Sequence, residues 1–166
     1  MNTPASPSTV ALLGTGRMGL PMATRLCQAG FTVHAWNRNR AKAEPLAALG
    51  AQVHDQATEA VRGADIVISM LENGPVVEQV LFGLGTAQAM KPGALVVDMA
   101  SIKPAEARDH AARLQAAYTT RGVPDDHTLY LKAHDGAPYA TVLRAVDSAR
   151  EIGVLHVTMI TDAPRD

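Results

Sequence analysis

The chain has 166 residues, about the length of one domain, and 47% of them are hydrophobic while 19% are charged, as in ordinary globular proteins. The formal net charge of -1 argues against a nucleic-acid-binding surface built from basic residues. No apolar run approaches the length that spans a membrane, so we expect neither nucleic acid nor a membrane as a partner.

Residues 1–8 have neither the basic region nor the apolar region of a secretory signal, and we expect them to form a disordered leader. Cys27, the single cysteine, cannot form an internal disulfide, which fits a reducing compartment and predicts a cytoplasmic location. Its expected place is that of a small buried hydrophobic residue on the first helix.

A glycine-rich turn follows the first expected strand directly. The apolar residues 10–13 lead into the pattern G-x-G-x-x-G at Gly14, Gly16 and Gly19, and a helical sequence comes next. In dinucleotide-binding turns the first glycine allows a tight turn, the second leaves room for a pyrophosphate, and the third lets the helix pack closely on the strand. The helix start offers free N–H groups and the positive end of its dipole to the phosphates. This order predicts a dinucleotide site; a glycine-rich turn without a ligand is the alternative.

Helical and strand patterns alternate along the chain as far as about residue 121, which is typical of a parallel doubly wound sheet. The handedness of parallel crossovers predicts the strand order 3-2-1-4-5, with further strands beyond the fifth. One expected helix, at 40–49, contains Pro45, which must weaken or kink it. The other expected elements are helices at 17–29, 58–62, 75–82 and 104–118, and strands at 10–13, 32–36, 51–54, 66–70 and 94–99.

A polar link with glycine and proline, at 119–126, separates this part from a tail of strand, helix and strand at 128–133, 139–152 and 155–159. Apolar and polar residues alternate in the tail strands, which indicates half-exposed strands near the edge of a sheet. We therefore expect an α/β doubly wound, mainly parallel sheet of six to seven strands. Residues 9–121 are its predicted cofactor-binding part, and residues 122–166 form a βαβ tail that continues the same sheet.

The end of the second strand predicts which dinucleotide binds. A carboxylate there, roughly 20 residues after the glycine turn, would bind the ribose hydroxyls of NAD, whereas an arginine suits the 2′-phosphate of NADP. The sequence has Asn37 and Arg38 there, followed by Arg40 and Lys42, and no carboxylate before Glu44. These cations predict NADP(H) in preference to NAD(H). The alternative is a solvated basic segment without a ligand.

With these motifs the chain resembles the β-hydroxyacid dehydrogenases, a group of oxidoreductases that includes 3-hydroxyisobutyrate dehydrogenase and has the imine reductases as neighbours. The stretches that carry the resemblance are residues 14–23, 35–38, 64–71 and 97–104, together with Lys42. The resemblance implies a Rossmann domain that binds NAD(P)H.

The resemblance also implies which residues contact the cofactor. The pyrophosphate is expected to contact Gly14, Thr15, Gly16, Arg17 and Met18, and the 2′-phosphate to contact Asn37, Arg38 and Lys42. The adenine and nicotinamide-ribose side is expected to meet Met70, Leu71, Glu72 and Val76. The hydroxyl of the family's D-x-S-T motif, beside the nicotinamide, corresponds to Ser101. Two residues depart from the family pattern: Glu72 stands where proline is common, and Ala100 replaces a small hydroxyl residue.

The family's catalytic parts have no counterpart in the sequence. Its D-A-P-V-S-G-G substrate loop is absent, as is the motif of the catalytic lysine on an all-α second domain. Lys132, the only lysine after Lys103, lies in an expected strand without a matching motif. We therefore predict no catalytic residue, and a cofactor domain that is not competent in catalysis alone.

The tail resembles the end of the periplasmic domain of ExbD/TolR biopolymer-transport proteins over residues 126–161. The transmembrane helix that carries that family's essential aspartate is absent, so its proton-linked function is not implied. A dehydrogenase-like part joined to such a tail predicts a recombined or engineered chimera, in which the tail supplies strands to the sheet.

Two other functions stay open at this point: a chimeric scaffold that binds nothing, and an interaction module whose exposed edge strand pairs with a partner. The expected assembly is a monomer or an edge-strand homodimer. The six histidines are scattered, with no i,i+4 pair on a helix and no cysteine partner, so no metal site is predicted. Ser101 has no neighbouring histidine to activate it as a nucleophile.

Overall fold

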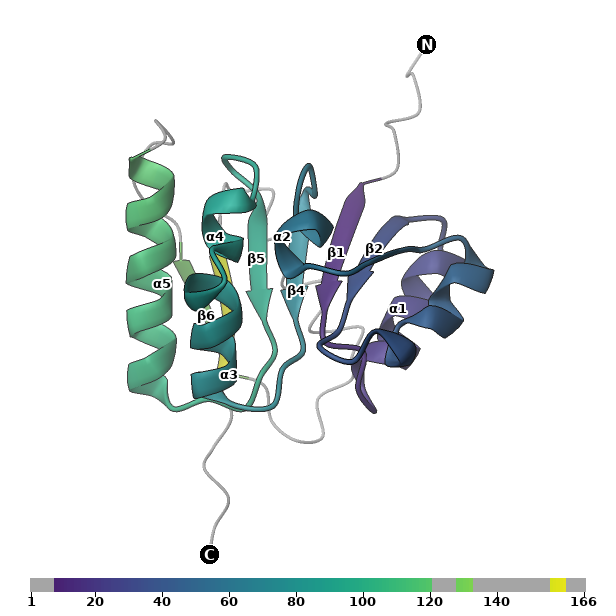
Figure 1. Cartoon of the computed structure of the whole chain (residues 1–166). Coiled ribbons are helices and arrows are strands. Elements are labelled where there is room, and N and C mark those ends of the chain that lie inside the picture. The colour runs from purple at the N-terminus through teal and green to yellow at the C-terminus, as the bar shows by residue number, and fades with distance from the viewer. Residues whose placement is uncertain (1–7, 121–127, 133–155, 161–166) are drawn as a thin grey trace, which may run out of the picture.

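The structure is a computed structural model, and it describes residues 8–120, 128–132 and 156–160. The described strands form one parallel sheet in the order β3-β2-β1-β4-β5-β7-β6 (Figure 1). This arrangement confirms the predicted α/β Rossmann-like fold with a doubly wound parallel sheet. The strands are β1 Thr9–Leu13, β2 Thr32–Trp36, β3 Gln52–His54, β4 Ile66–Ser69, β5 Leu95–Asp98, β6 Thr128–Lys132 and β7 His156–Ile160.

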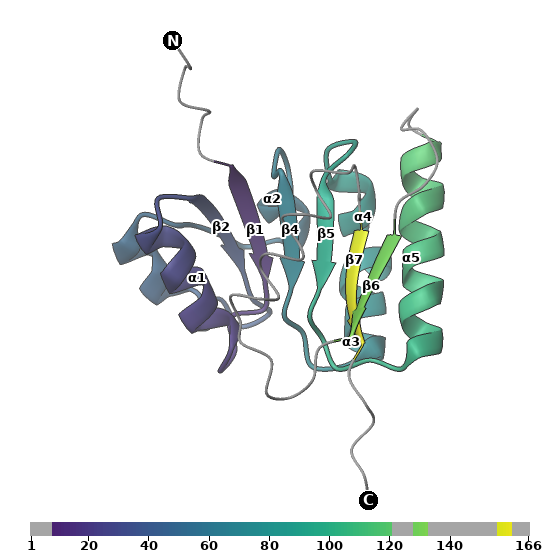
Figure 2. The ribbon, with the colours of Figure 1, turned by 180° about the vertical axis from the view of Figure 1, so that it is seen from behind.

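Helices cover both faces of the sheet. On one face lie α1 and the short helices η1 and η2, whereas α2 to α5 lie on the other (Figures 1 and 2). The helices of the first face are α1 Gly19–Gln28, η1 Arg40–Lys42 and η2 Glu44–Leu49. Those of the second face are α2 Ala57–Ala60, α3 Gly74–Glu78, η3 Gln79–Gly83, α4 Thr86–Ala89 and α5 Pro104–Thr119.

The central strand β1 contributes to a hydrophobic core on each face, because its side chains alternate between the two sides of the sheet. Ala11 and Leu13 belong to the core beneath α2 to α5, and Leu12 to the core beneath α1. All three are fully buried. A strand covered on both faces needs this continuous apolar sequence.

The structure departs from the expected elements at three places. The expected helix at 40–49 is two short 3₁₀ helices, η1 and η2, with Pro45 in the first turn of η2, where its missing N–H costs least. The expected helix at 75–82 turns into a π-helix, η3, at Gln79. The helix α4, Thr86–Ala89, has no counterpart among the expected elements.

Beyond β5 the sheet continues with β7 and then β6, both parallel to their neighbours. The expected helix at 139–152, the expected link at 119–126 from residue 121 on, and the leader up to residue 7 lie outside the described residues. The domain boundaries therefore stay predictions. Within the described ranges, no helix is both long enough and apolar enough to cross a membrane.

Candidate functional site

A cleft of about 850 Å³ opens where the parallel strands end. The chain order reverses between β1 and β4, so their following loops leave in opposite directions and a crevice forms at the carboxyl ends of the strands. Two walls bound this cleft. The glycine-loop wall comprises lining residues from 14–19 and 36–42, and the apolar wall those from 70–84 together with Met99 and Ser101.

The three glycines of the glycine-loop wall meet three different surroundings. Gly14 has a φ of 100°, and a Cβ there would lie 2.5 Å from the Met70 carbonyl oxygen. A Cβ on Gly19 would lie 1.8 Å from the Gly14 carbonyl oxygen, because α1 begins directly against the turn. At Gly16, which lines the cleft, no atom lies within 4 Å of such a Cβ. The loop is therefore tightly packed at both ends and open in the middle.

The end of β2 is hydrogen-bonded to the glycine loop at two successive residues. The Gly14 N–H donates to the Trp36 carbonyl at 2.8 Å, and the Thr15 N–H donates to Oδ1 of Asn37 at 3.1 Å. Nδ2 of Asn37 in turn donates to the Asn39 carbonyl at 2.9 Å. The polar atoms of the Asn37 side chain thus bond to two backbone segments.

The cations after β2 fall into two groups. Arg38 and Lys42 line the cleft, and within the described ranges neither forms an ion pair. Arg40 is outside the lining and pairs with Glu44 at 2.6 Å and Asp55 at 2.8 Å. These hydrogen bonds, that from Glu44 foremost, raise the pKa of the Arg40 guanidinium. The cleft therefore has two free positive charges beside β2 and no carboxylate there.

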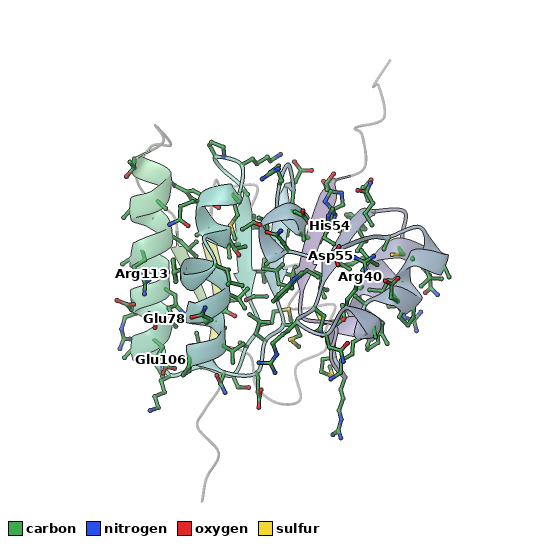
Figure 3. The ribbon with its side chains drawn as sticks, viewed as in Figure 1. Arg40, His54, Asp55, Glu78, Glu106 and Arg113 are labelled. Atoms are coloured by element: carbon green, nitrogen blue, oxygen red, sulfur yellow. The ribbon has the colours of Figure 1, made fainter. Side chains whose placement is uncertain are left out.

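Ion pairs stand on both sides of the molecule, as Figure 3 shows. Arg40 and Asp55 lie at one side, whereas Arg113 of α5 and Glu78 of α3 lie at the other, with 3.0 Å between their charged atoms. The Arg113 guanidinium also stacks 3.9 Å from the centre of the Phe82 ring. These contacts join α3, η3 and α5 behind the apolar wall.

The apolar wall is made mainly of aliphatic and thioether side chains. Met70, Leu71 and Glu72 follow β4, Val76 lies in α3, and Ser101 follows β5. Glu72 is the only acidic residue of the lining as described. The wall continues through η3, where Val80 lines the cleft and also packs, with its neighbour Leu81, in the core beneath α2 to α5.

A buried carboxyl holds the turn that leads to Ser101. Oδ1 of Asp98 accepts from the Ser69 hydroxyl at 2.6 Å and from the Ala100 N–H at 3.1 Å. Burial raises the pKa of Asp98, and the hydrogen bond from Ser69 opposes that shift. The bonds fix the direction in which the chain leaves β5, and with it the position of Ser101.

Of the residues expected at the site, twelve line the cleft and Thr15 does not, because its side chain is 2% exposed inside the glycine loop. Sequence reasoning missed several lining residues: Gly19, Trp36, Asn39, Pro75, Gln79, Val80, Leu84 and Met99. The glycine pattern predicts for Gly19 only close packing of the helix on the strand. Trp36 and Met99 lie within two residues of the expected site residues Asn37 and Ser101 in the sequence. Gln79 and Val80 follow Val76 by three and four residues in the expected helix, a spacing that places them on its face, whereas no pattern predicts Leu84 beyond the end of that helix. The described residues include no group of three or more potential metal ligands.

The comparisons with known proteins identify the domain. A family profile described as the NAD binding domain of 6-phosphogluconate dehydrogenase matches residues 9–121. The chain belongs to this family of NAD-binding domains. The open position at Gly16 and the free cations beside it fit a nicotinamide dinucleotide, the ligand of such domains.

Two enzymes illustrate the sequence similarity. The NAD-dependent L-serine dehydrogenase of Pseudomonas aeruginosa is 37% identical over 115 residues, which cover 69% of this chain and 37% of that enzyme. The 3-sulfolactaldehyde reductase of Escherichia coli is 33% identical over 123 residues, or 73% of this chain and 41% of the reductase. The chain thus spans about two fifths of the length of these relatives.

Solved structures share the fold over more of the chain. The 3-hydroxyisobutyrate dehydrogenase of Mycobacterium tuberculosis, solved with L-serine, has a TM-score of 0.66 at 26% identity and covers 95% of this chain and 55% of its own. An imine reductase of Myxococcus stipitatus, in complex with NADP+, has a TM-score of 0.65 at 24% identity over 92% of this chain and 55% of its own. The second similarity concerns the fold alone. At 95% coverage the similarity to the dehydrogenase extends past residue 121.

Proposed function

We propose that this NAD-binding domain is of the β-hydroxyacid dehydrogenase type and prefers NADP(H) to NAD(H). One observation carries the proposal: among the residues that the structure describes, Arg38 and Lys42 line the cleft and form no ion pair, and no carboxylate lines the cleft beside β2. A 2′-phosphate needs cations at this point, whereas the ribose hydroxyls of NAD need an acceptor. The relatives do not decide the matter, since one is NAD-dependent by name and another is in complex with NADP+.

The remaining cofactor contacts follow from the two walls. The open backbone around Gly16 and the N-terminus of α1 suit the pyrophosphate, next to Arg17 and Met18. Met70, Leu71 and Val76 offer apolar surface to the rings. The hydroxyl of Ser101 suits the nicotinamide end. When bound, the cofactor supplies or accepts the hydride.

Substrate chemistry is a separate proposal. The substrate-loop and catalytic-lysine motifs of the family have no counterpart in the sequence, and Lys132 belongs to β6 at the edge of the sheet. We therefore assign no catalytic residue, and hydride transfer depends on a proton donor and substrate pocket that these residues do not supply. Activity on small hydroxyacids stays an expectation from the family.

The origin of the tail and its edge also stay proposals. The resemblance of residues 126–161 to ExbD/TolR proteins, and with it a chimeric origin, has no support beyond the sequence itself. The similarity to a dehydrogenase structure past residue 121 favours a tail that belongs to the dehydrogenase fold. The sheet has β3 and β6 at its edges, so edge pairing between two copies remains an alternative to a monomer.

Calorimetric titration with NADPH and NADH tests the cofactor preference. We expect NADPH to bind more tightly, and Arg38→Ala to weaken NADPH by about 10- to 100-fold, the scale of one hydrogen bond to a charged group, while NADH changes little. Arg40→Ala is the matched control, because its guanidinium is outside the cleft lining. Equal affinities for the two cofactors would contradict the preference, and no binding of either by the wild-type chain would contradict the cofactor site.

A further inference from the structure

Asn37 occupies the position from which dinucleotide-binding domains reach the ribose, yet its side chain is engaged inside the protein. Its Oδ1 accepts from the Thr15 N–H at 3.1 Å, and its Nδ2 donates to the Asn39 carbonyl at 2.9 Å. The first bond reaches back 22 residues to the glycine loop. The second closes the turn that immediately follows β2.

Each of these bonds continues into a part of the cofactor cleft. Thr15 lies between Gly14 and Gly16, the two glycines of the loop that line the cleft, and its side chain is buried. On the other side, Oδ1 of Asn39 accepts from the Ala41 N–H at 3.1 Å and caps η1, which contains Lys42. One carboxamide therefore connects the loop that faces the pyrophosphate with the turn that presents Arg38 and Lys42.

We infer that Asn37 is a positioning residue: its carboxamide clamps the glycine loop to the turn of Arg38 and Lys42. The cofactor side of this inference rests on the proposed function, whereas the clamp is a property of the free protein. The clamp fixes the spacing between the two phosphate sites before the ligand arrives, so less ordering accompanies binding.

Three ligands separate a clamp from a direct contact: NADPH, NADH, and the NADH analogue that lacks the 2′-hydroxyl of the adenosine ribose. If Asn37 is a clamp, Asn37→Ala weakens all three by a similar factor, roughly 2- to 10-fold, because the disordered loop is common to them. If Asn37 contacts the ligand directly, the loss is largest for NADPH and vanishes for the 2′-deoxy analogue. That pattern would overturn the inference.

Hydrogen exchange of the Thr15 amide in the free protein tests the clamp without any nucleotide. We expect Asn37→Ala to speed this exchange and Asn37→Asp to preserve its protection, since aspartate keeps the oxygen that accepts from Thr15. Asn73→Ala is the matched control: it removes an equivalent side-chain bond, to the Val76 N–H at 3.1 Å, and leaves the Thr15 amide untouched.

Nucleotide affinity and Thr15 amide exchange test the proposed function and the clamp independently. Unchanged Thr15 exchange in Asn37→Ala would refute the clamp even if NADPH binds as proposed. Absence of nucleotide binding by the wild-type protein would refute the proposed function, while the exchange rates would still decide whether the clamp exists. If Asn37→Ala does not fold, Asn37→Leu takes its place, because it also removes the oxygen that accepts from the Thr15 N–H, and unchanged Thr15 exchange in that variant would equally refute the clamp.

Discussion

The two walls of the cleft are held by different kinds of constraint. On the glycine-loop wall, contacts with single backbone atoms determine which residues are tolerated. Gly14 and Gly19 leave no space for a Cβ, and the carboxamide of Asn37 bonds to two backbone segments. On the apolar wall many side chains contribute surface, and Val80 packs in the core with Leu81 while it also lines the cleft. The first wall is specified by residues that cannot be exchanged, and the second by volume that several residues can fill.

The largest expected effect breaks the glycine-loop wall. Gly19→Ala places a Cβ 1.8 Å from the Gly14 carbonyl oxygen, so the backbone must move, and we expect unfolding to become easier by about 4 kcal/mol or more. Urea denaturation measures this. Gly16→Ala is the matched control, since its Cβ meets no atom within 4 Å; it should keep the stability and lose nucleotide affinity. Equal stability of the two variants would contradict the comparison.

A smaller effect is expected when the apolar wall is altered. Leu81 lies in η3, outside the cleft lining but fully buried in the core that supports the apolar wall, and Leu81→Ala removes packing at a cost of about 3 kcal/mol in unfolding free energy. Nucleotide affinity of the folded fraction should stay close to that of the wild type, because Leu81 does not line the cleft. Denaturation and calorimetry on the same sample measure both. A large loss of affinity at unchanged stability would show that this wall, too, depends on single residues.

The smallest expected effect concerns Asp98, the buried carboxyl whose hydrogen bonds hold the turn that leads to Ser101 in the apolar wall. Burial raises the pKa of Asp98 in the folded state, so the folded protein holds this proton more tightly than the unfolded chain. Its contribution to stability is therefore full below the usual aspartate pKa and is lost as the pH rises through the raised value.

Asp98→Asn cannot titrate and keeps an oxygen for the Ser69 hydroxyl and the Ala100 N–H. The asparagine variant should gain stability relative to the wild type as the pH rises through that window, measured by denaturation at several pH values. Ser69→Ala removes the bond that favours the ionised form, so it should steepen the pH dependence of the protein that retains Asp98. A stability difference that does not vary with pH would contradict this account.

Sequence reasoning succeeded where backbone geometry demands a particular residue. The glycine turn, the doubly buried β1 and the order of the first five strands follow from glycine spacing, apolar runs and crossover handedness, and the structure has them. The glycine-loop wall, which has the stricter residue requirements, is also the wall of which more lining residues were predicted. Thr15 is the exception, because a loop pattern does not tell which side chains turn inward.

Sequence reasoning failed where several backbone conformations of a segment have similar local energies. The residues of η1 and η2 are compatible with an α-helix apart from Pro45, and only packing in the fold selects 3₁₀ turns. The π-helix leaves no pattern of its own, so Leu84, which follows it and lines the cleft, could not be predicted. Both tail strands alternate apolar and polar residues, and alternation does not say that β7 rather than β6 lies next to β5.

That last placement determines the order in which the sheet can assemble. Among the described strands, β6 pairs only with β7, and β7 fills the position next to β5, although β6 comes first along the chain. β6 therefore joins the sheet only through β7, either after β7 has docked or together with it as a pair, and both routes need long-range chain closure. The cleft takes its lining from residues between Gly14 and Ser101. The binding site can accordingly be complete on a five-stranded nucleus, before the outer two strands arrive.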